Sequence, residues 1–278
     1  MGLDMKQLMT ECTRFRNVRL IGVSVLLVFL GFQSNNVDAY DEIQVYDMSI
    51  NQPGQLALEM HSNYVISGRK TADYAGELPP DGILAFTGEF SYGLTHYIEL
   101  GLYVPMSINP STGGSYEDDA KLRVKFLNAD TPAFFYGLNI EIGLVPKRYS
   151  EQKVGMEIRP IIGHYTGDWL IAFNPNLELH LSGSSQMPDF APSLKVTHQV
   201  INNVHFGFEH YADFGGLNNF APGQEQGQTT YLVADISKDN YRFHIGIGHG
   251  WTAASDTWML KCILGGIPLG ELINPNRW

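Results

Sequence analysis

The sequence has few cysteines, and this shortage excludes folds held together by intramolecular disulfides or by a cysteine metal cluster. It holds only two, Cys12 and Cys262. Cys12 lies in an N-terminal stretch that we expect to be removed, so Cys262 would be the one cysteine of the mature chain. An intramolecular disulfide and a cysteine metal cluster both need more thiols than that. Cys262 precedes Ile263 and Leu264 in an alternating stretch, and we expect it to be an inert apolar residue.

Long apolar runs are also scarce. One run of 13 residues extends from Leu20 to Phe32, which is short of the ~20 residues of a membrane-spanning helix. Basic residues precede the run, and Val37-Asp38-Ala39 follows it. This pattern predicts a secretory signal peptide over residues 1–39, with an uncleaved anchor as the alternative. After Tyr40 no run approaches ~20 apolar residues, so the mature chain can cross a membrane only as a closed sheet.

Positive charge is in short supply. The chain has 18 Lys and Arg against 29 Asp and Glu, a net charge of −11. Removal of residues 1–39 would leave about −12, because that stretch is slightly basic. Nucleic acid is negatively charged and binds basic surfaces, so it is not an expected partner of this acidic chain.

What the sequence does contain is twelve stretches of alternating apolar and polar residues between Leu56 and Leu264. Their connections alternate in length: 67–81, 107–118, 147–153 and 215–227 are long, 184–188 and 251–255 are intermediate, and 95–96, 128–132, 167–168, 201–203 and 239–240 are short. An even number of strands with short turns at one end is typical of bacterial outer-membrane barrels. A soluble β-sandwich, the alternative, does not explain this sorting of connections.

We therefore predict an all-β fold, a transmembrane antiparallel up-and-down β-barrel of about 12 strands over residues 54–264. Residues 40–53 are assigned to a periplasmic N-terminal segment, although folding into the lumen stays open. Residues 265–278 are assigned to a periplasmic tail, so both termini are expected in the periplasm. The predicted location is the outer membrane. The expected partners are outer-membrane lipid, lipopolysaccharide, the barrel-insertion machinery and an unidentified small solute.

Side chains of a strand point alternately to its two faces, so the alternation also predicts a lining. The apolar set would face lipid and the charged set would face the lumen, where charges of opposite sign should pair across strands. The candidate lumen and selectivity residues are Glu59, Glu89, Glu99, Arg123, Lys125, Glu141, Glu157, Arg159, Glu178, Lys195, Glu209, Arg242 and Lys261. In the tenth stretch the faces are ambiguous, because Asp235 shares a face with Tyr231 and Val233.

Several runs carry a resemblance to known proteins. They are EIQVYD (42–47), EFSYGLTHYIELGLYVP (89–105), AKLRVKF (120–126), EIRPIIG (157–163) and FGFEHYADFG (206–215). The chain resembles a group of uncharacterised proteobacterial outer-membrane barrel proteins. That group is related to the transporter-like family named for the meta-cleavage pathway of phenol degradation. The resemblance implies a barrel and a transport role, and it carries no substrate and no catalytic residues.

Three functions are consistent with these observations. The first is a channel for passive passage of small molecules through the charged lumen. The second is a hydrolase acting on lipid, for which outward histidines exist (His164, His198 and His210), although G-x-S-x-G is absent from the sequence. The third is a plugged structural barrel whose loops 67–81, 107–118 and 215–227 bind a ligand. We favour the channel.

The inward histidines raise the question of a metal or acid–base site. His61, His180, His205 and His244 are in phase with luminal carboxylates, and acid–base or metal chemistry needs such groups close together. We interpret them as hydrogen-bonding groups of the lumen. The sequence prediction is therefore no catalytic residue, no metal and no cofactor.

Overall fold

The structure is a computed structural model that describes residues 42–131, 133–182, 187–239 and 241–271. The predicted signal peptide lies outside these residues. Within the described part, no helix is long and apolar enough to cross a membrane. The strands are β1 (Gln55–Ser67), β2 (Leu84–Gly93), β3 (Ile98–Asn109), β4 (Gly114–Glu117), β5 (Lys121–Asn128), β6 (Phe135–Leu144), β7 (Val154–Thr166), β8 (Trp169–Asn174), β9 (Leu177–His180), β10 (Asp189–Phe190), β11 (Ser193–Ile201), β12 (Val204–Asp213), β13 (Gly227–Lys238), β14 (Tyr241–Gly250) and β15 (Trp258–Glu271).

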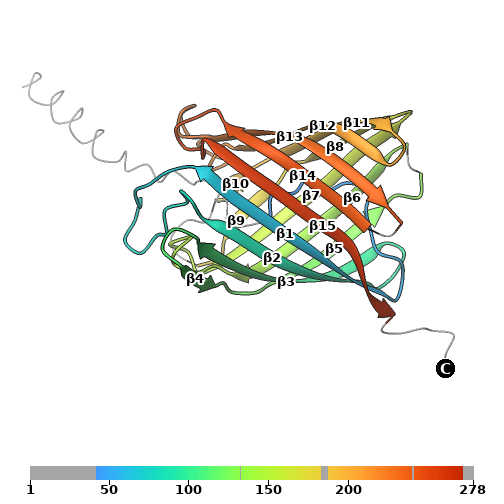
Figure 1. Cartoon of the computed structure of the whole chain (residues 1–278), viewed down its shortest axis with the longest axis horizontal. Coiled ribbons are helices and arrows are strands. Elements are labelled where there is room, and N and C mark those ends of the chain that lie inside the picture. The colour runs from blue at the N-terminus through green and yellow to red at the C-terminus, as the bar shows by residue number, and fades with distance from the viewer. Residues whose placement is uncertain (1–41, 132, 183–186, 240, 272–278) are drawn as a thin grey trace, which may run out of the picture. The chain divides into compact units, whose positions relative to one another are not determined.

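Sequential antiparallel pairing closes the strands into a barrel (Figure 1). Each strand of the wall pairs with its neighbours in the chain, and β15 returns to pair with β1 from Gln55↔Glu271 to Ser67↔Trp258. Short turns such as 94–97 lie at one end of the barrel, and long connections such as 68–83 and 214–226 lie at the other. The prediction of a twelve-stranded up-and-down barrel is confirmed.

Three prolines explain why the ladder is interrupted on one side of the barrel. β7 pairs with both β8 and β9 in one register, from Ile162↔Phe173 to Ile158↔Leu177. The pairing of β8 with β11 and that of β9 with β10 also share one register. β8 and β9 are therefore one strand, and so are β10 and β11. The breaks fall at Pro175 and Pro192, level with Pro160 of β7, because proline has no N–H for the ladder.

Two boundaries differ from the prediction. β3 and β4 extend a hairpin into the connection that was expected as a loop over 107–118, with Met106↔Glu117 to Asn109↔Gly114 paired. A turn closes it, in which the Asn109 side chain accepts the Ser111 N–H at 3.0 Å and Gly113 has a φ of 71°. The last strand continues to Glu271, so residues 265–271 belong to the barrel, whereas 272–278 lie outside the described residues.

The two faces of the wall are separated as the alternation predicted. Leu122, Val124 and Leu232 are among the outward side chains and are 50–60% exposed, as expected for a surface that faces lipid. The ambiguous tenth stretch becomes β13, in which Tyr231 and Val233 point inward and are 1% exposed. Polar and charged side chains occupy much of the inner face.

The chain that precedes β1 lies in the lumen, the second of the two positions that the sequence left open. The Glu42 carboxylate meets Lys121 at the start of β5, near the long connections. At the other end, the Gly54 N–H donates to the Gly93 carbonyl oxygen beside a short turn. Residues 42–53 thus run inside the barrel from one end to the other.

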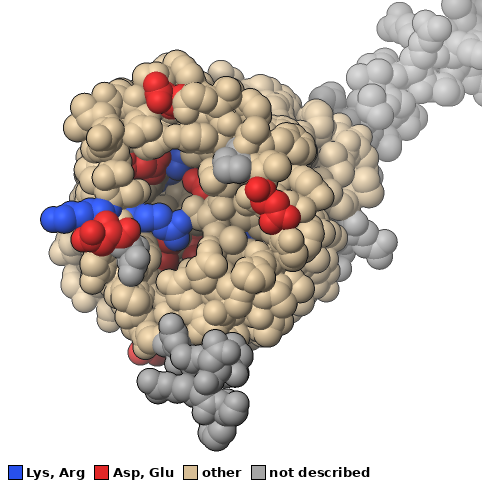
Figure 2. Space-filling view, turned by 90° about the vertical axis from the view of Figure 1, so that its right-hand side faces the viewer, with Lys and Arg blue, Asp and Glu red and all other residues tan. Residues whose placement is uncertain are grey.

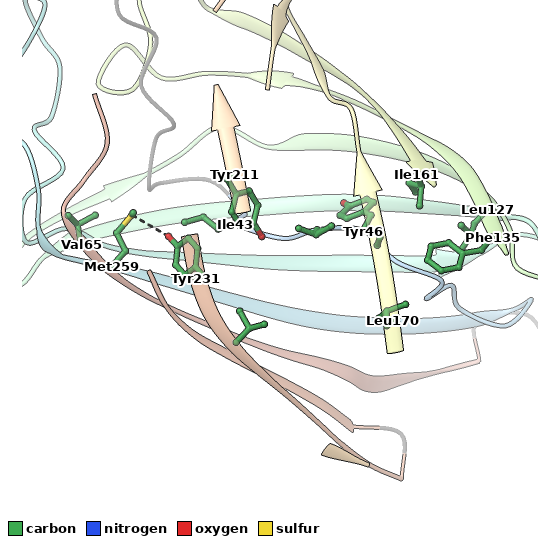
Figure 3. Close-up of a cluster of buried hydrophobic side chains, with 13 residues drawn as sticks. Ile43, Tyr46, Val65, Leu127, Phe135, Ile161, Leu170, Tyr211, Tyr231 and Met259 are labelled. Carbon is green, nitrogen blue, oxygen red and sulfur yellow. Dashed lines mark hydrogen bonds between the residues drawn. The ribbon is translucent and has the colours of Figure 1, made fainter. Parts of the chain in front are cut away.

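This segment also supplies part of an apolar core inside the barrel. Ile43, Val45 and Tyr46 are 2–6% exposed. Figure 3 shows Ile43 near Tyr211, Tyr231 and Met259, whereas Leu127, Phe135 and Ile161 gather toward the end with the short turns. One apolar cluster inside the barrel therefore reaches toward both of its ends.

Candidate functional site

The luminal charges surround a cavity between residues 42–53 and the wall. Its volume is about 100 Å³, and it is partly open to solvent. All thirteen predicted lumen residues lie on inward-facing positions of strands. Those that line this cavity are Glu59, Glu89, Glu99, Arg123, Lys125, Lys195, Glu209 and Arg242.

One group of charges sits on β2, β3 and β5. Arg123 contacts the Glu89 carboxylate and lies 2.8 Å from Glu99 Oε1, and Lys125 Nζ lies 2.8 Å from the same oxygen. The other Glu99 oxygen accepts the Asn51 N–H at 2.7 Å, which ties the wall to the luminal segment. Glu89, Glu99 and Arg123 are 3–5% exposed. Buried ions are costly unless they are paired, and here each carboxylate has a basic partner.

A second group sits on β11–β15. Glu209 is 1% exposed and contacts Lys261. Lys195 Nζ lies 3.0 Å from Asp235 Oδ2 and 3.7 Å from Asp47 Oδ2 of the luminal segment. The other Asp235 oxygen is 2.6 Å from His244 Nδ1. This group is a continuous network that joins several strands to the segment.

The predicted residues that do not line the cavity have other positions. Arg159 stacks on the Tyr46 ring, with its guanidinium carbon 4.4 Å from the ring centre, and donates to the Gln44 carbonyl oxygen. It also pairs with Glu157 on the same strand. Glu141 accepts the Tyr46 hydroxyl at 3.0 Å. Glu178 lies in β9, opposite Glu157 of β7 and Asp189 of β10, and Lys261 is fully covered beneath Ile43.

The segment is held by side chains that the sequence did not single out. Asn174 is 0% exposed, accepts the Tyr46 N–H at 2.6 Å and donates to the Tyr46 carbonyl oxygen at 3.0 Å. The Tyr46 and Tyr103 hydroxyl oxygens are 2.5 Å apart. Asn174 and Tyr103 do lie on the predicted inward phase of their strands, and that phase was the available signal. No sequence signal pointed to Asp47. Its place in the lumen depends on where the segment before β1 folds.

The cavity carries more negative than positive groups. Six carboxylates line it, from Asp47, Glu59, Glu89, Glu99, Glu209 and Asp235, against four basic side chains, Arg123, Lys125, Lys195 and Arg242. Figure 2 views the barrel from the end with the short turns and shows a hollow with acidic and basic side chains inside it. A lining with this excess of carboxylates attracts cations.

The outward histidines have contacts of a different kind. Both ring nitrogens of His210 are hydrogen-bonded, to Thr230 Oγ1 at 2.9 Å and to Gln228 Oε1 at 3.0 Å. The His198 ring packs against Trp169, with ring centres 4.6 Å apart. The partners of His210 are thus not the serine and acid that a hydrolytic triad requires.

Comparisons with known proteins support the architecture. No protein-family model and no curated protein matches the chain. Among solved structures, an outer membrane channel from Pseudomonas putida F1 is similar, with a TM-score of 0.56 at 13% identity. The match covers 81% of this chain and 99% of that one. The NanC porin has a TM-score of 0.50 at 9% identity, covering 75% of this chain and 97% of the porin. The chain has the fold and the apolar outer surface of a bacterial outer-membrane barrel.

Proposed function

We propose that this barrel is an outer-membrane channel that passes small solutes through its charged lumen, with a preference for cations. The observation that carries the proposal is the partly solvent-open cavity of about 100 Å³, in which carboxylates outnumber basic groups. Resemblance to the transporter-like family named above points to small organic or aromatic molecules as cargo. Passive diffusion down a gradient needs no catalytic group.

The luminal segment determines how wide such a path can be. Gln44, Asp47, Ser49 and Asn51 all contribute to the lining, so the path runs between this segment and the wall. A solute would pass ion pairs that are already formed, such as Lys125 with Glu99. The free path is accordingly narrow, and a small conductance is expected.

Single-channel recording in planar bilayers tests the proposal, using residues 40–278 refolded in detergent. We expect discrete conductance steps and a reversal potential, in a KCl gradient, that shows preference for K⁺. The Asp47→Asn variant should lower this preference, because it removes a carboxylate from the lining. The control Asp119→Asn, in an exposed connection, should leave it unchanged. Deletion of residues 42–51 should raise the conductance.

Two results would contradict the proposal. Correctly folded protein that gives no steps, with or without residues 42–51, would show that the lumen does not conduct. Steps that favour Cl⁻ would contradict the role assigned to the carboxylates. If the steps favour K⁺ as expected, swelling of protein-containing liposomes in small sugars or aromatic acids identifies the class of solute that enters.

A further inference from the structure

One cluster of the inner wall combines a histidine with two carboxylates. Glu59 and His61 are two residues apart on β1, so both face the lumen. Glu89 of β2 is the direct cross-strand partner of Glu59. Glu59 and Glu89 line the cavity, whereas His61 lies behind them and is 2% exposed. Two like charges directly opposite each other destabilise a sheet unless a positive group lies between them.

The spacing of His61 from the two carboxylates resembles that found in a metal site. His61 Nε2 is 3.4 Å from Glu59 Oε1 and 3.4 Å from Glu89 Oε2. One ligand atom from each residue lies within 4.8 Å of the other two. Bonds of about 2.1 Å at a tetrahedral angle place two ligand atoms about 3.4 Å apart. The separations between His61 and the two carboxylates are therefore those expected of ligands around one zinc ion.

His61 itself provides an independent reason to expect a ligand. Neither of its ring nitrogens has a hydrogen-bond partner, although the side chain is buried. Buried polar groups are nearly always hydrogen-bonded, and an exception calls for an explanation such as a bound ion. Nε2 points at the two carboxylate oxygens without the geometry of a hydrogen bond to either. A cation between the three atoms would give Nε2 and the two carboxylate oxygens a common partner.

The surrounding contacts leave the required oxygens available. Arg123 binds Glu89 through Oε1, which is not the oxygen near His61. Arg242 Nη2 is 3.8 Å from the distant Glu59 oxygen, Oε2. Glu59 Oε1 accepts a hydrogen bond from Gln44 Nε2 at 2.9 Å, and a carboxylate oxygen has lone pairs for a second partner. The site therefore also touches the luminal segment.

We propose that Glu59, His61 and Glu89 bind a divalent transition-metal ion of the zinc type. One imidazole nitrogen and two carboxylate oxygens would supply three ligands, and a fourth position would face the cavity. Three protein ligands with one open position is a common arrangement for zinc. This differs from the sequence interpretation, which treated His61 as a hydrogen-bonding group of the lumen. The proposal does not depend on whether the barrel conducts.

Zinc binding to refolded residues 40–278 tests the proposal. Equilibrium dialysis against ZnCl₂, with elemental analysis of the protein, should give one site per chain that His61→Gln abolishes or weakens. Changing a residue that only supports a metal ligand typically costs about 10–100-fold in affinity, so loss of a ligand should cost at least about tenfold. His244→Gln is the matched control, because it removes another inward histidine and should leave the site intact.

X-ray absorption spectroscopy of the wild-type zinc complex gives a readout that does not depend on a variant's folding. We expect one imidazole and otherwise oxygen ligands. Two or more imidazoles, or equal zinc affinity in wild type and folded His61→Gln, would overturn the proposal and indicate a different site. No zinc binding by the wild type, with both His61 nitrogens protonated by NMR, would also overturn it. His61 would then be an imidazolium held between the carboxylates.

Discussion

At the scale of single residues, Lys261 illustrates how the lumen accommodates charge. Its side chain is 0% exposed. The ammonium group contacts Glu209 and donates to the Ile43 carbonyl oxygen at 3.1 Å and to the Tyr211 hydroxyl at 3.0 Å. It also lies 4.8 Å from the centre of the Tyr231 ring. All of its charge is therefore compensated inside the protein, so loss of the lysine would leave a buried carboxylate with less compensation.

We predict that Lys261→Met lowers the free energy of unfolding by ~3–5 kcal/mol, the usual cost of removing one member of a buried ion pair. Urea unfolding of the refolded barrel in lipid vesicles measures it. Adding Glu209→Gln should recover part of the loss, because the remaining buried charge is then removed. Lys238→Met, at an exposed position, is the control. A loss no greater than that of this control would show that the pair is not stabilising.

The inward position of these residues could be predicted from sequence, but their partners could not. Alternation along a strand is a local property, and so it was enough to place Glu209 and Lys261 on the inner face. The contact between Lys261 and Ile43 joins residues 218 positions apart. It depends on the luminal segment, whose run EIQVYD does not by itself indicate whether it lies inside or outside a barrel. The same limit applies to Asn174 and its two hydrogen bonds with Tyr46.

At the scale of elements, strand continuity was predictable where the local pattern is continuous. The stretches around 169–183 and 189–200 were expected as single strands, and common registers show that each is one strand interrupted at a proline. The hairpin extension formed by β4 was not expected. Its four residues are too few to show an alternating pattern, and their pairing depends on how long β3 continues. Contacts between loops could likewise not be predicted from the sequence.

The long connection 68–83 and the intermediate connection 251–257 are joined through a buried carboxylate. Asp256 is 8% exposed, and its Oδ1 accepts the Arg69 N–H at 3.2 Å. The pKa of Asp256 is raised to about 6. Burial is the main cause and the nearby Asp81 adds to it, whereas Arg69 acts to lower the pKa. An aspartate of the unfolded chain has a pKa of about 3.9. The folded state therefore binds the Asp256 proton more tightly than the unfolded state does. The resulting contribution to the free energy of unfolding is complete below about pH 4 and is lost as the pH rises through about 6.

We predict that Asp256→Asn stabilises the barrel at pH 7 and has little effect near pH 4. The amide keeps an oxygen that can accept the Arg69 N–H and has no proton to lose. The gain at pH 7 should not exceed ~3 kcal/mol, since one pKa unit corresponds to about 1.36 kcal/mol. Urea midpoints of the two proteins between pH 4 and 7 give the difference. A difference that does not change with pH would contradict the assignment, and Asp119→Asn serves as the exposed control.

At the scale of the whole molecule, the sorting of connections gives the barrel a direction. The turns 94–97 and 202–203 share one end with the end of β15, and the connections 68–83 and 214–226 share the other. Outer-membrane barrels keep short turns in the periplasm and long loops outside the cell. Residues 42–53 run between the two ends, and Glu42 lies at the end with the long connections. On this orientation the described N-terminal residues face the outside, whereas β15 ends on the periplasmic side.

Cysteine labelling in intact cells tests this orientation. In a Cys262→Ala background, a cysteine at Thr112 or Asn219 should react with a membrane-impermeant maleimide, because both positions are exposed in long connections. A cysteine at His96, exposed in the short turn 94–97, should react only after the outer membrane is permeabilised. Labelling of His96→Cys alone in intact cells would reverse the orientation. Equal labelling of all three in intact cells would mean that the reagent passes the membrane, which a periplasmic control protein detects.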